Sequence, residues 1–503
     1  MGVLSGLEPE KVFYFFEEIT KIPHASGNME QISNYLVEFA KERNLFHIQD
    51  EIKNVIIVKE ATPGYENEPA IILQGHMDMV AVKKPDCDID MKTQGLQVAV
   101  DGDKIYAVGT SLGGDDGIAV AYALAILDSN ELKHPRLEVV ITVDEEVGLD
   151  GAREIDLSML KGSRMINLDS EEEGIFLTSC AGGARVGCHV PVIFAEVEGI
   201  AVEVSLGGLQ GGHSGAEIHK ERGNSNALFG RFLWRISEKI PVAVQSLNGG
   251  LADNAIPRET RAVLVIKEKD KEVFDKIIKD VAANLAEEYA TKDPGITIET
   301  KELGKGVYPC VTPEDTRNAA SFLFALPCGV QAMSADMPGL VETSLNMGIL
   351  ELEAAESCLD ADADFLDELS DEVFGELTAE FSVRSSVESA KYALIDKLEA
   401  ITVMAGGDIT ITGEYPGWKY RKNSPLRDKM VALYEKMYGE KPRVEAIHAG
   451  LECGILGSKI TDLDCVSMGP QMSDIHTTEE TLSISSTARV WDYLVKLLEE
   501  KDN

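Results

Sequence analysis

The sequence predicts an α/β protein whose catalytic domain has a mostly parallel sheet covered by helices on both faces, interrupted by an inserted α+β sandwich domain. Three observations lead to this fold class. Short apolar runs alternate with helical segments over residues 1–180. The pattern changes near Val186, and helices and strands with the first pattern return after Tyr415. Buried parallel strands are typically continuous apolar runs, and the helices between them cover both faces of the sheet.

The N-terminal segment supplies most elements of the parallel sheet. Apolar residues at helical spacing predict a helix over residues 12–19, and Asn28 with Gln31 predicts a capping box before a second helix. An apolar, Ala-rich stretch at residues 117–127 predicts a buried helix. Apolar runs rich in β-branched residues predict strands at residues 55–58, 70–73, 137–143, 165–168 and 175–178.

The middle of the chain contains two broadly similar passages of strands and helices. They predict two α+β sandwich units, and a duplication is left open because no clean sequence repeat is visible. A chain of 503 residues exceeds the roughly 250–300 residues at which one core stops growing. Residues 187–411 are therefore expected to form an inserted lid domain. The passages comprise residues 201–235, 260–266 and 272–290, then residues 312–326, 341–352, 378–385 and 388–401.

The C-terminal segment is expected to rejoin the first domain. Leu426, Met430 and Leu433 predict an amphipathic helix, and a Gly-rich turn, a short strand at residues 465–467 and a final helix follow. Residues 1–186 and 412–503 together are thus the predicted catalytic domain.

Composition limits the partners and the compartment. Lys+Arg 47 against Asp+Glu 86 gives a net charge of −39, which argues against nucleic acid or an anionic membrane as a partner. The sequence has no signal peptide and no apolar run of about 20 residues that could span a bilayer. The eight cysteines include no C-x-x-C pair, which is typical of reduced thiols, so a cytoplasmic location is expected.

An acidic stretch at residues 351–376 contains alternating aspartates that suggest a calcium-binding loop. Phe365 and Asp371 occupy the positions where such a loop needs Gly and Glu. A solvated acidic loop is therefore the prediction for this stretch.

A histidine or a carboxylate follows each of four predicted strands, and another histidine follows a later strand. One of the four strands is expected at residues 105–108, ahead of the glycines before Asp115. Each placement alone is weak, because a lone His-x-Asp or a pair of acids is usually a solvated turn. Ligands of open α/β sheets bind beyond the carboxyl ends of strands, so these segments should converge on one crevice. The residues are His76, Asp115, Glu146, Asp169 and His476.

This set of residue types indicates a metal site. Imidazole together with several carboxylates is the ligand set expected for zinc, manganese or cobalt, and thiolate sites are absent from the sequence. The sequence contains no Gly-x-Ser-x-Gly elbow, P-loop, dinucleotide fingerprint or His-Glu-x-x-His motif.

Seven segments, in order along nearly the whole chain, resemble the aminoacyl-histidine dipeptidases (peptidase D, carnosinase-like or cytosol non-specific dipeptidases) of the co-catalytic zinc exopeptidases. In this family the second residue of the Asp115-Asp116 pair is often Asn, and the acidic stretch is shorter. The segments are Gln74-Gly-His-Met-Asp-Met-Val80, Gly113-Gly-Asp-Asp-Gly117, Asp144-Glu-Glu-Val-Gly148, Gly211-Gly-His-Ser-Gly215, Asp253-Asn-Ala-Ile-Pro257, Tyr415-Pro-Gly-Trp418 and His448-Ala-Gly-Leu-Glu-Cys-Gly454.

The resemblance implies a set of metal ligands. Two divalent metal ions, zinc first and manganese or cobalt as alternatives, would share Asp115 as a bridge. His76 and Asp169 would complete the coordination of one ion, and Glu146 and His476 that of the other. The resemblance also implies a cis peptide bond after Asp115.

The resemblance implies catalytic roles as well. Asp78 would orient His76, and Glu145 would be the general base. His213 on the lid domain would stabilise the oxyanion, while Asn254 and Arg384 would hold the carboxylate end of the substrate. Without the family match, His213 is a histidine in a Gly-rich turn and Arg384 is a surface charge on a strand.

The expected activity is hydrolysis of dipeptides such as Xaa-His, with β-alanyl-histidine left open. The alternatives are an N-acyl-amino-acid amidohydrolase on the same scaffold and a non-catalytic metal-bound regulator. The intact Glu145 beside Glu146 argues against the regulator. A small peptide is the expected partner, and the sequence leaves open whether the chain forms a homodimer.

Overall fold

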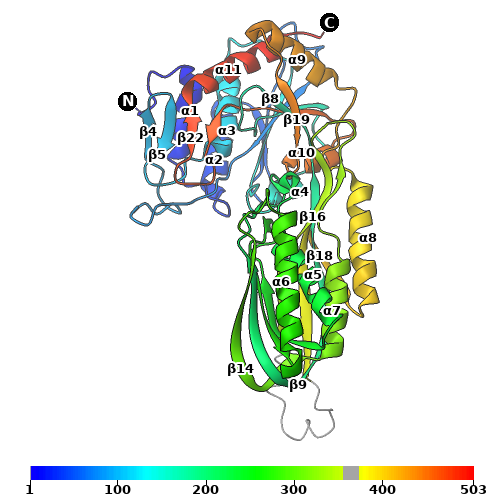
Figure 1. The fold of residues 1–503 in the computed structure, drawn as a ribbon. Helices are drawn as coiled ribbons and strands as arrows, with labels where there is room; N and C mark the ends of the chain where they lie inside the picture. Colours follow the sequence, from blue (N-terminus) through cyan, green and yellow to red (C-terminus); the bar gives the residue numbers. More distant parts are fainter. Residues whose placement is uncertain (1, 355–372, 503) are drawn as a thin grey trace, which may run out of the picture. The chain divides into compact units, whose positions relative to one another are not determined.

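The computed structural model describes residues 2–354 and 373–502, which form two compact units (Figure 1). Unit 1 comprises Met1–Cys180, Trp418–Ala446 and Leu451–Asn503, and unit 2 comprises Ala181–Gly417 and Ile447–Gly450. Most of the acidic stretch, and with it the predicted acidic loop, lies outside the described residues.

Unit 1 is built on a mixed sheet of eight strands, in agreement with the predicted α/β fold. Its centre, β6-β3-β7-β20, is parallel. The pairs β1–β2, β2–β6 and β20–β8 are antiparallel. The order is β1 (Phe46–Gln49), β2 (Val55–Lys59), β6 (Leu137–Thr142), β3 (Ile71–His76), β7 (Arg164–Asn167), β20 (Asp464–Ser467), β8 (Ile175–Cys180) and β19 (Arg443–Ile447).

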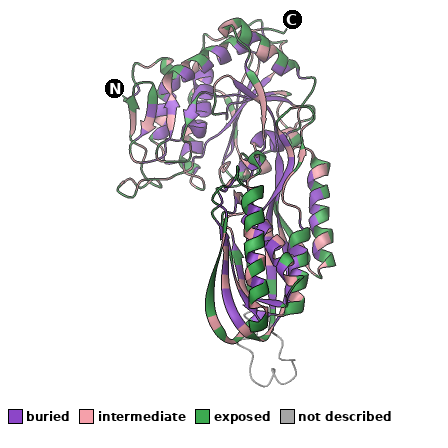
Figure 2. Cartoon of the chain, viewed as in Figure 1, coloured by how far each residue is buried: buried purple, intermediate pink, exposed green. Residues whose placement is uncertain are grey.

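Helices bury the faces of this sheet, and α3 (Gly114–Asp128) is apolar on every side. All but the last of its residues are buried (Figure 2), as the Ala-rich sequence predicts. The predicted capping box is wrong, because α2 begins after Met29 and no side chain caps it. The other helices of unit 1 are α1 (Glu10–Thr20), α2 (Glu30–Glu42), α4 (Asp150–Glu154), α9 (Pro425–Tyr438), α10 (Glu452–Lys459) and α11 (Ile484–Glu499).

A second, small antiparallel sheet contains the strand that was predicted to lead to Asp115 from the main sheet, so this prediction is wrong. The strand ahead of Asp115 does not belong to the main sheet but pairs with one strand of the C-terminal segment and with the strand that precedes it in the chain. Asp115 therefore approaches the other candidate residues from the start of α3 and not from the end of a parallel strand. This sheet has the order β21 (Met472–Ser473), β22 (Thr481–Ser483), β5 (Lys104–Ala107) and β4 (Val98–Asp101).

Unit 2 contains one continuous antiparallel sheet, and the predicted two sandwich units share it. The 26-residue strand β9 (Gly182–Gly207) runs through both halves. Its first half pairs with β17 and β18, and its second half pairs with β13 and β14. The other strands are β11 (Val242–Gly249), β13 (Thr260–Ile266), β14 (Thr297–Val311), β15 (Gly329–Met333), β16 (Val341–Ala354), β17 (Val373–Ser385) and β18 (Asp408–Tyr415).

Four helices pack on the long strands of unit 2 (Figure 1) and form its main hydrophobic core with them. On α6 the buried residues recur at helical spacing, so one side faces the core while the other is exposed (Figure 2). A short hairpin, β10 (Gly212–His213) with β12 (Ala255–Ile256), lies outside the large sheet. The helices are α5 (Ser225–Ser237), α6 (Lys271–Glu288), α7 (Pro313–Ala325) and α8 (Glu388–Met404), with short 3₁₀ turns at Ile218–Lys220 and Glu268–Asp270.

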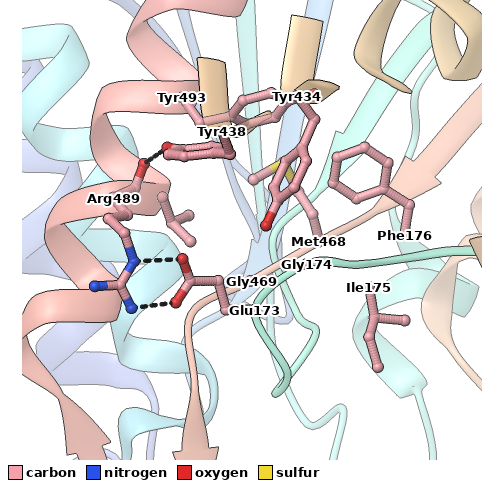
Figure 3. A pocket seen from close by; sticks show the side chains of 11 residues that line it. Glu173, Gly174, Ile175, Phe176, Tyr434, Tyr438, Met468, Gly469, Arg489 and Tyr493 are labelled. Atoms are coloured by element: carbon pink, nitrogen blue, oxygen red, sulfur yellow. Dashed lines mark hydrogen bonds and ion pairs between the residues drawn. The ribbon is translucent and has the colours of Figure 1, made fainter. Parts of the chain in front are cut away.

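An aromatic cavity in unit 1 is part of the core and not a binding site. Tyr434 and Tyr493 pack on Phe176, and both carboxylate oxygens of Glu173 accept hydrogen bonds from Arg489 (Figure 3). The cavity volume is about 10 Å³. That space holds about one water molecule, so the cavity excludes a substrate.

Among residues 2–354 and 373–502, no helix combines the length and the apolar character needed to cross a bilayer.

Two glycines of unit 2 have similar backbone conformations but differ in the space around them, so substitutions there distinguish backbone strain from steric overlap. Gly250 (φ +81°) and Gly329 (φ +86°) both have left-handed backbone conformations. A Cβ at Gly250 would lie 1.8 Å from the carbonyl oxygen of Gly348, whereas a Cβ at Gly329 meets nothing within 4 Å. We expect Gly329→Ala to lower the free energy of unfolding by about 1–2 kcal/mol. Gly250→Ala should lower it by roughly a further 1–3 kcal/mol, the usual cost of overpacking.

Urea unfolding followed by circular dichroism measures both losses. Equal losses in the two variants would show that the Gly348 carbonyl moves aside without cost.

Candidate functional site

The five predicted metal ligands gather in unit 1 around Asp115. Its Oδ1 lies 3.1 Å from Nε2 of His76, and its Oδ2 lies 3.1 Å from Nε2 of His476. The same nitrogen of His76 lies 3.5 Å from Oδ1 of Asp169. Nε2 of His476 lies 2.9 Å from Oε1 of Glu146. One carboxylate thus has a histidine at each of its two oxygens.

The elements explain this convergence. His76 is the last residue of β3, Asp169 follows β7 by two residues, and Glu146 lies in the turn after β6. These three strands are neighbours and run parallel, so their ends meet at one edge. Asp115 joins them from the first turn of α3, and the Asp115–Asp116 peptide bond is cis, as predicted.

Asp78 holds the turn that carries the two glutamates. Its Oδ1 accepts the N–H of Glu145 (3.1 Å), and its Oδ2 accepts the N–H of Glu146 (3.4 Å) and the Ser26 hydroxyl (2.8 Å). Nδ1 of His76 is 3.0 Å from the backbone oxygen of Asp78 and 3.4 Å from its carboxylate. A proton on Nδ1 leaves the lone pair of Nε2 directed at Asp115 and Asp169.

Several buried oxygens of this cluster have no hydrogen-bond partner. Oε1 of Glu146 is one, in spite of its distance to His476, and Oδ1 of the fully buried Asp116 is another. Buried polar atoms are almost always paired, so unpaired oxygens beside histidines fit a cation. Within the described residues, three groups bring their ligand atoms within 4.8 Å of one another: His76, Asp116 and Asp169; His76, Glu145 and Glu146; and Asp115, Glu146 and His476.

The electrostatics also fit a bound cation. Burial raises the pKa of Glu145 well above its ordinary value, and it raises the pKa of Asp169 to about 6 in spite of His76. Burial would raise the pKa of Asp115 too, but hydrogen bonds with His476 and His76 hold it well below its ordinary value. The carboxylates of Asp115 and Glu146 raise the pKa of His476 to about 10. In the cluster around Asp115, carboxylates thus outnumber the cationic groups, as a site for a bound cation requires.

A buried polar network, which the sequence reasoning missed, lies behind the cluster. The Glu452 carboxylate accepts hydrogen bonds from Gln74 (2.5 Å) and the Thr142 hydroxyl (2.6 Å), and the Asn167 amide donates to Gln74 (2.6 Å). These residues come from three neighbouring strands and from the first turn of α10. Burial raises the pKa of Glu452 to about 7. Glu452 lies in one of the seven matching segments, but nothing local indicated its partners.

In unit 2, His213 has a defined tautomer. Its Nδ1 accepts the N–H groups of Gly215 (3.1 Å) and Ala216 (3.0 Å), so the ring proton lies on Nε2. Burial and the nearby Arg384 lower the pKa of His213. His213 is therefore a neutral hydrogen-bond donor. Asn254 is adjacent to it, because its carbonyl accepts the N–H of Ser214 (2.8 Å) and β10 pairs with β12.

Arg384 lies on β17 close to a second histidine to which the sequence reasoning gave no role. Its Nη1 donates to the Tyr415 hydroxyl (3.0 Å), while its buried Nε has no partner. His448 is 2.7 Å from the Ser344 hydroxyl through Nε2, and its buried Nδ1 has no hydrogen-bond partner. Ser344 pairs with Arg384 in the sheet. His448 and Tyr415 lie in two of the seven segments that carry the family resemblance, and the sequence holds no other signal for them.

Comparisons with known proteins match the whole chain. Residues 72–500 match the model of the peptidase family M20/M25/M40. The chain is 33% identical over 506 residues to the cytosol non-specific dipeptidase of Escherichia coli, covering 99% of each. The crystal structure of aminoacylhistidine dipeptidase from Vibrio alginolyticus matches with a TM-score of 0.88 and 33% identity, over 100% of this chain and 99% of that chain. Aminopeptidase PepT of Bacillus cereus shares the fold (TM-score 0.59, 16% identity, 98% of each chain).

His448 makes the stability of unit 2 depend on pH. Burial and the charge of Arg384 lower its pKa to about 3. Between this value and the ordinary value of about 6.5, the unfolded chain binds the proton and the folded chain does not. The neutral ring of His448 thus makes its full contribution to the free energy of unfolding above about pH 6.5, and this contribution is lost as the pH falls toward 3. From pH 7 to pH 5 the loss amounts to about 2 kcal/mol.

His448→Gln removes this titration and leaves all other groups in place. We expect its unfolding free energy to fall by about 2 kcal/mol less than that of the parent chain over the same pH interval. Urea unfolding at pH 7 and pH 5 measures both differences. An identical pH dependence of the two proteins would mean that His448 takes up its proton in the folded state.

Proposed function

The chain belongs to the peptidase family M20/M25/M40, and from this premise we propose that it hydrolyses the amide bond of dipeptides with two divalent metal ions. The observation that carries the proposal is the position of Asp115 between His76 and His476, with one histidine at each carboxylate oxygen. A carboxylate so placed suits a bridge between two cations.

We assign the ligands as the motifs imply. His76, Asp115 and Asp169 hold one ion, and Asp115, Glu146 and His476 hold the other. The buried Oε1 of Glu146 supports this assignment, since it lies among potential ligand atoms and 2.9 Å from Nε2 of His476. Nitrogen and carboxylate donors without thiolates favour zinc, with manganese or cobalt as alternatives.

Glu145 is the proposed general base. When bound, the two ions supply Lewis-acid activation of water and of the scissile carbonyl. Glu145 takes a proton from the attacking water and then delivers it to the amine that leaves. Its backbone N–H is held by Asp78, and burial raises the pKa of its carboxyl well above the ordinary value. The adjacent Glu146 is the proposed metal ligand.

Three residues of unit 2 are assigned to the substrate. His213 presents a neutral Nε2–H, the donor needed to stabilise an oxyanion. Arg384 has an unpaired Nε and a planar fork that fits a carboxylate. Asn254, next to His213, supplies a second polar group for the carboxylate end of the substrate.

Dipeptides are the proposed substrates because two full-length relatives with 33% identity are named as dipeptidases. We also propose a cytosolic location, which agrees with the name of the Escherichia coli relative. Purified, metal-loaded protein should hydrolyse a free dipeptide such as β-alanyl-histidine or Gly-His faster than its N-acetylated form. Preference for the acetylated form would identify an amidohydrolase instead, and no hydrolysis of either would contradict the proposal.

The neighbours Glu145 and Glu146 should respond differently to the same substitution. Glu145→Gln preserves shape but cannot accept a proton, so we expect both metals to remain and kcat to fall by roughly 10²–10⁴-fold. Glu146→Gln should weaken one metal site, and excess metal should partly restore its activity. Metal content after dialysis, together with dipeptide turnover, measures both effects.

Two results would contradict these roles. Loss of metal from Glu145→Gln with both metals retained in Glu146→Gln would reverse the assignment. Unchanged hydrolysis in both variants would exclude the mechanism.

Arg384→Lys should weaken substrate binding without loss of metal. A bidentate fork becomes a point charge, so we expect KM to rise about tenfold or more while kcat changes less. Arg231→Lys is the matched control, because Arg231 is also an arginine of unit 2 but pairs with Glu288 on the surface. Steady-state kinetics and metal analysis of both variants test this, and a metal-depleted Arg384→Lys would show that the assignment is wrong.

A further inference from the structure

Glu480 is a buried carboxylate that the proposed mechanism does not use. It lies in the segment between β21 and β22, four residues after His476, and is 3% exposed. Its Oε2 accepts the N–H groups of Leu112 (2.8 Å) and Gly113 (3.2 Å). Its Oε1 accepts those of Gly114 (2.8 Å) and Asp115 (3.4 Å). One side chain thus receives four consecutive backbone N–H groups from a segment more than 360 residues away in sequence.

These N–H groups have no alternative partner of their own. They precede α3 or belong to its first turn, where backbone N–H groups lack an acceptor within the helix. Gly113, the residue before α3, has φ +68°, and no side chain of its own segment caps the helix. The start of α3 is buried, so Glu480 supplies the acceptors that water cannot.

The hydrogen-bond partners of the Glu480 carboxylate are all backbone N–H groups. Within the described residues Glu480 forms no ion pair with Lys, Arg or His, although it is almost fully buried. Four N–H groups converge on this carboxylate, next to the non-helical backbone at Asp115 and Asp116. They offset part of the lost hydration, and burial still raises the pKa of Glu480. The neighbouring Glu479 differs, because its exposed side chain pairs with Lys84 on the surface.

Glu480 therefore links the segments that carry two of the proposed ligands. Its side chain fixes the backbone of Asp115, the proposed bridge, and its own main chain continues from His476. We propose that Glu480 is a positioning residue that holds Asp115 and His476 in metal-binding geometry before any metal is bound. The proposal rests on the proposed function, because it concerns the same dinuclear centre.

Glu480→Gln tests the proposal, with Glu479→Gln as the matched control. The amide keeps the size of the side chain but turns an NH₂ group toward N–H donors, so half of the acceptors are lost. Partners that orient metal ligands are typically worth 10–100-fold in metal affinity. We expect zinc affinity, measured by chelator competition on folded protein, to fall by about 10–100-fold in Glu480→Gln and to stay unchanged in Glu479→Gln.

Activity at saturating zinc separates positioning from catalysis. Glu480→Gln should regain most of its dipeptide turnover at high zinc concentration, with KM near that of the parent chain. A purely structural role would lower the melting temperature of the metal-free protein and leave the zinc affinity of the folded protein unchanged, which would overturn the proposal. Absence of zinc binding by the parent chain would overturn the proposed function together with this proposal.

Hydrogen exchange of the unsubstituted protein tests the same point without a variant that must fold. The amides of Leu112, Gly113 and Gly114 should exchange slowly in the metal-free protein, because Glu480 already binds them. Rapid exchange that slows only after zinc is added would overturn the proposal, since the metal would then order the segment.

Discussion

The concentration of buried carboxylates around two histidines is the constraint on which unit 1 depends. Carboxylates placed together away from water repel one another, and each needs hydrogen bonds or a cation. The carboxylates outside the proposed ligand set obtain their hydrogen bonds from segments that carry ligands. Asp78 accepts N–H groups of Glu145 and Glu146, Asp116 accepts that of His76 (3.2 Å), and Glu480 accepts that of Asp115. The groups that are costly to bury are therefore the groups that fix the backbone of the site.

The parallel strands make this arrangement rigid. Glu452 joins side chains of β3 and β6, and Gln74 extends the connection to Asn167 of β7. Gln74 and His76 are two residues apart in β3, so their side chains point to the same face of the sheet. Asn167 is the last residue of β7, two residues before Asp169. These hydrogen bonds tie the positions of the strand ends to one another, although Oδ1 of Asn167 and Oε1 of Glu452 have no hydrogen-bond partner.

Local sequence patterns predicted the fold class and the convergence of the candidate ligands on one place, because both depend on short segments. An apolar run followed directly by His76 or Asp169 predicts a strand end with a candidate ligand. The capping box at Asn28 failed because the helix begins later, and the route to Asp115 failed because the pairing of β5 with β22 joins segments that are distant in sequence. The contacts of Glu452 and Glu480 were beyond prediction for the same reason. His213, Asn254 and Arg384 were predicted from the family resemblance and not from the residue pattern, and their roles stay predictions.

The two units also differ in the chemistry that they gather. Unit 1 concentrates anionic acceptors, whereas the cluster in unit 2 offers donors: the guanidinium of Arg384 and the Nε2–H of His213. Burial, and then the charge of Arg384, lower the pKa of both His213 and His448, so both rings stay neutral and leave a single full positive charge among the three side chains. With a net charge of −39, the chain as a whole repels anions at long range. Under the proposed role of Arg384, recognition of a substrate carboxylate therefore depends on a short-range, directional contact, which a buried arginine with an unpaired Nε can make.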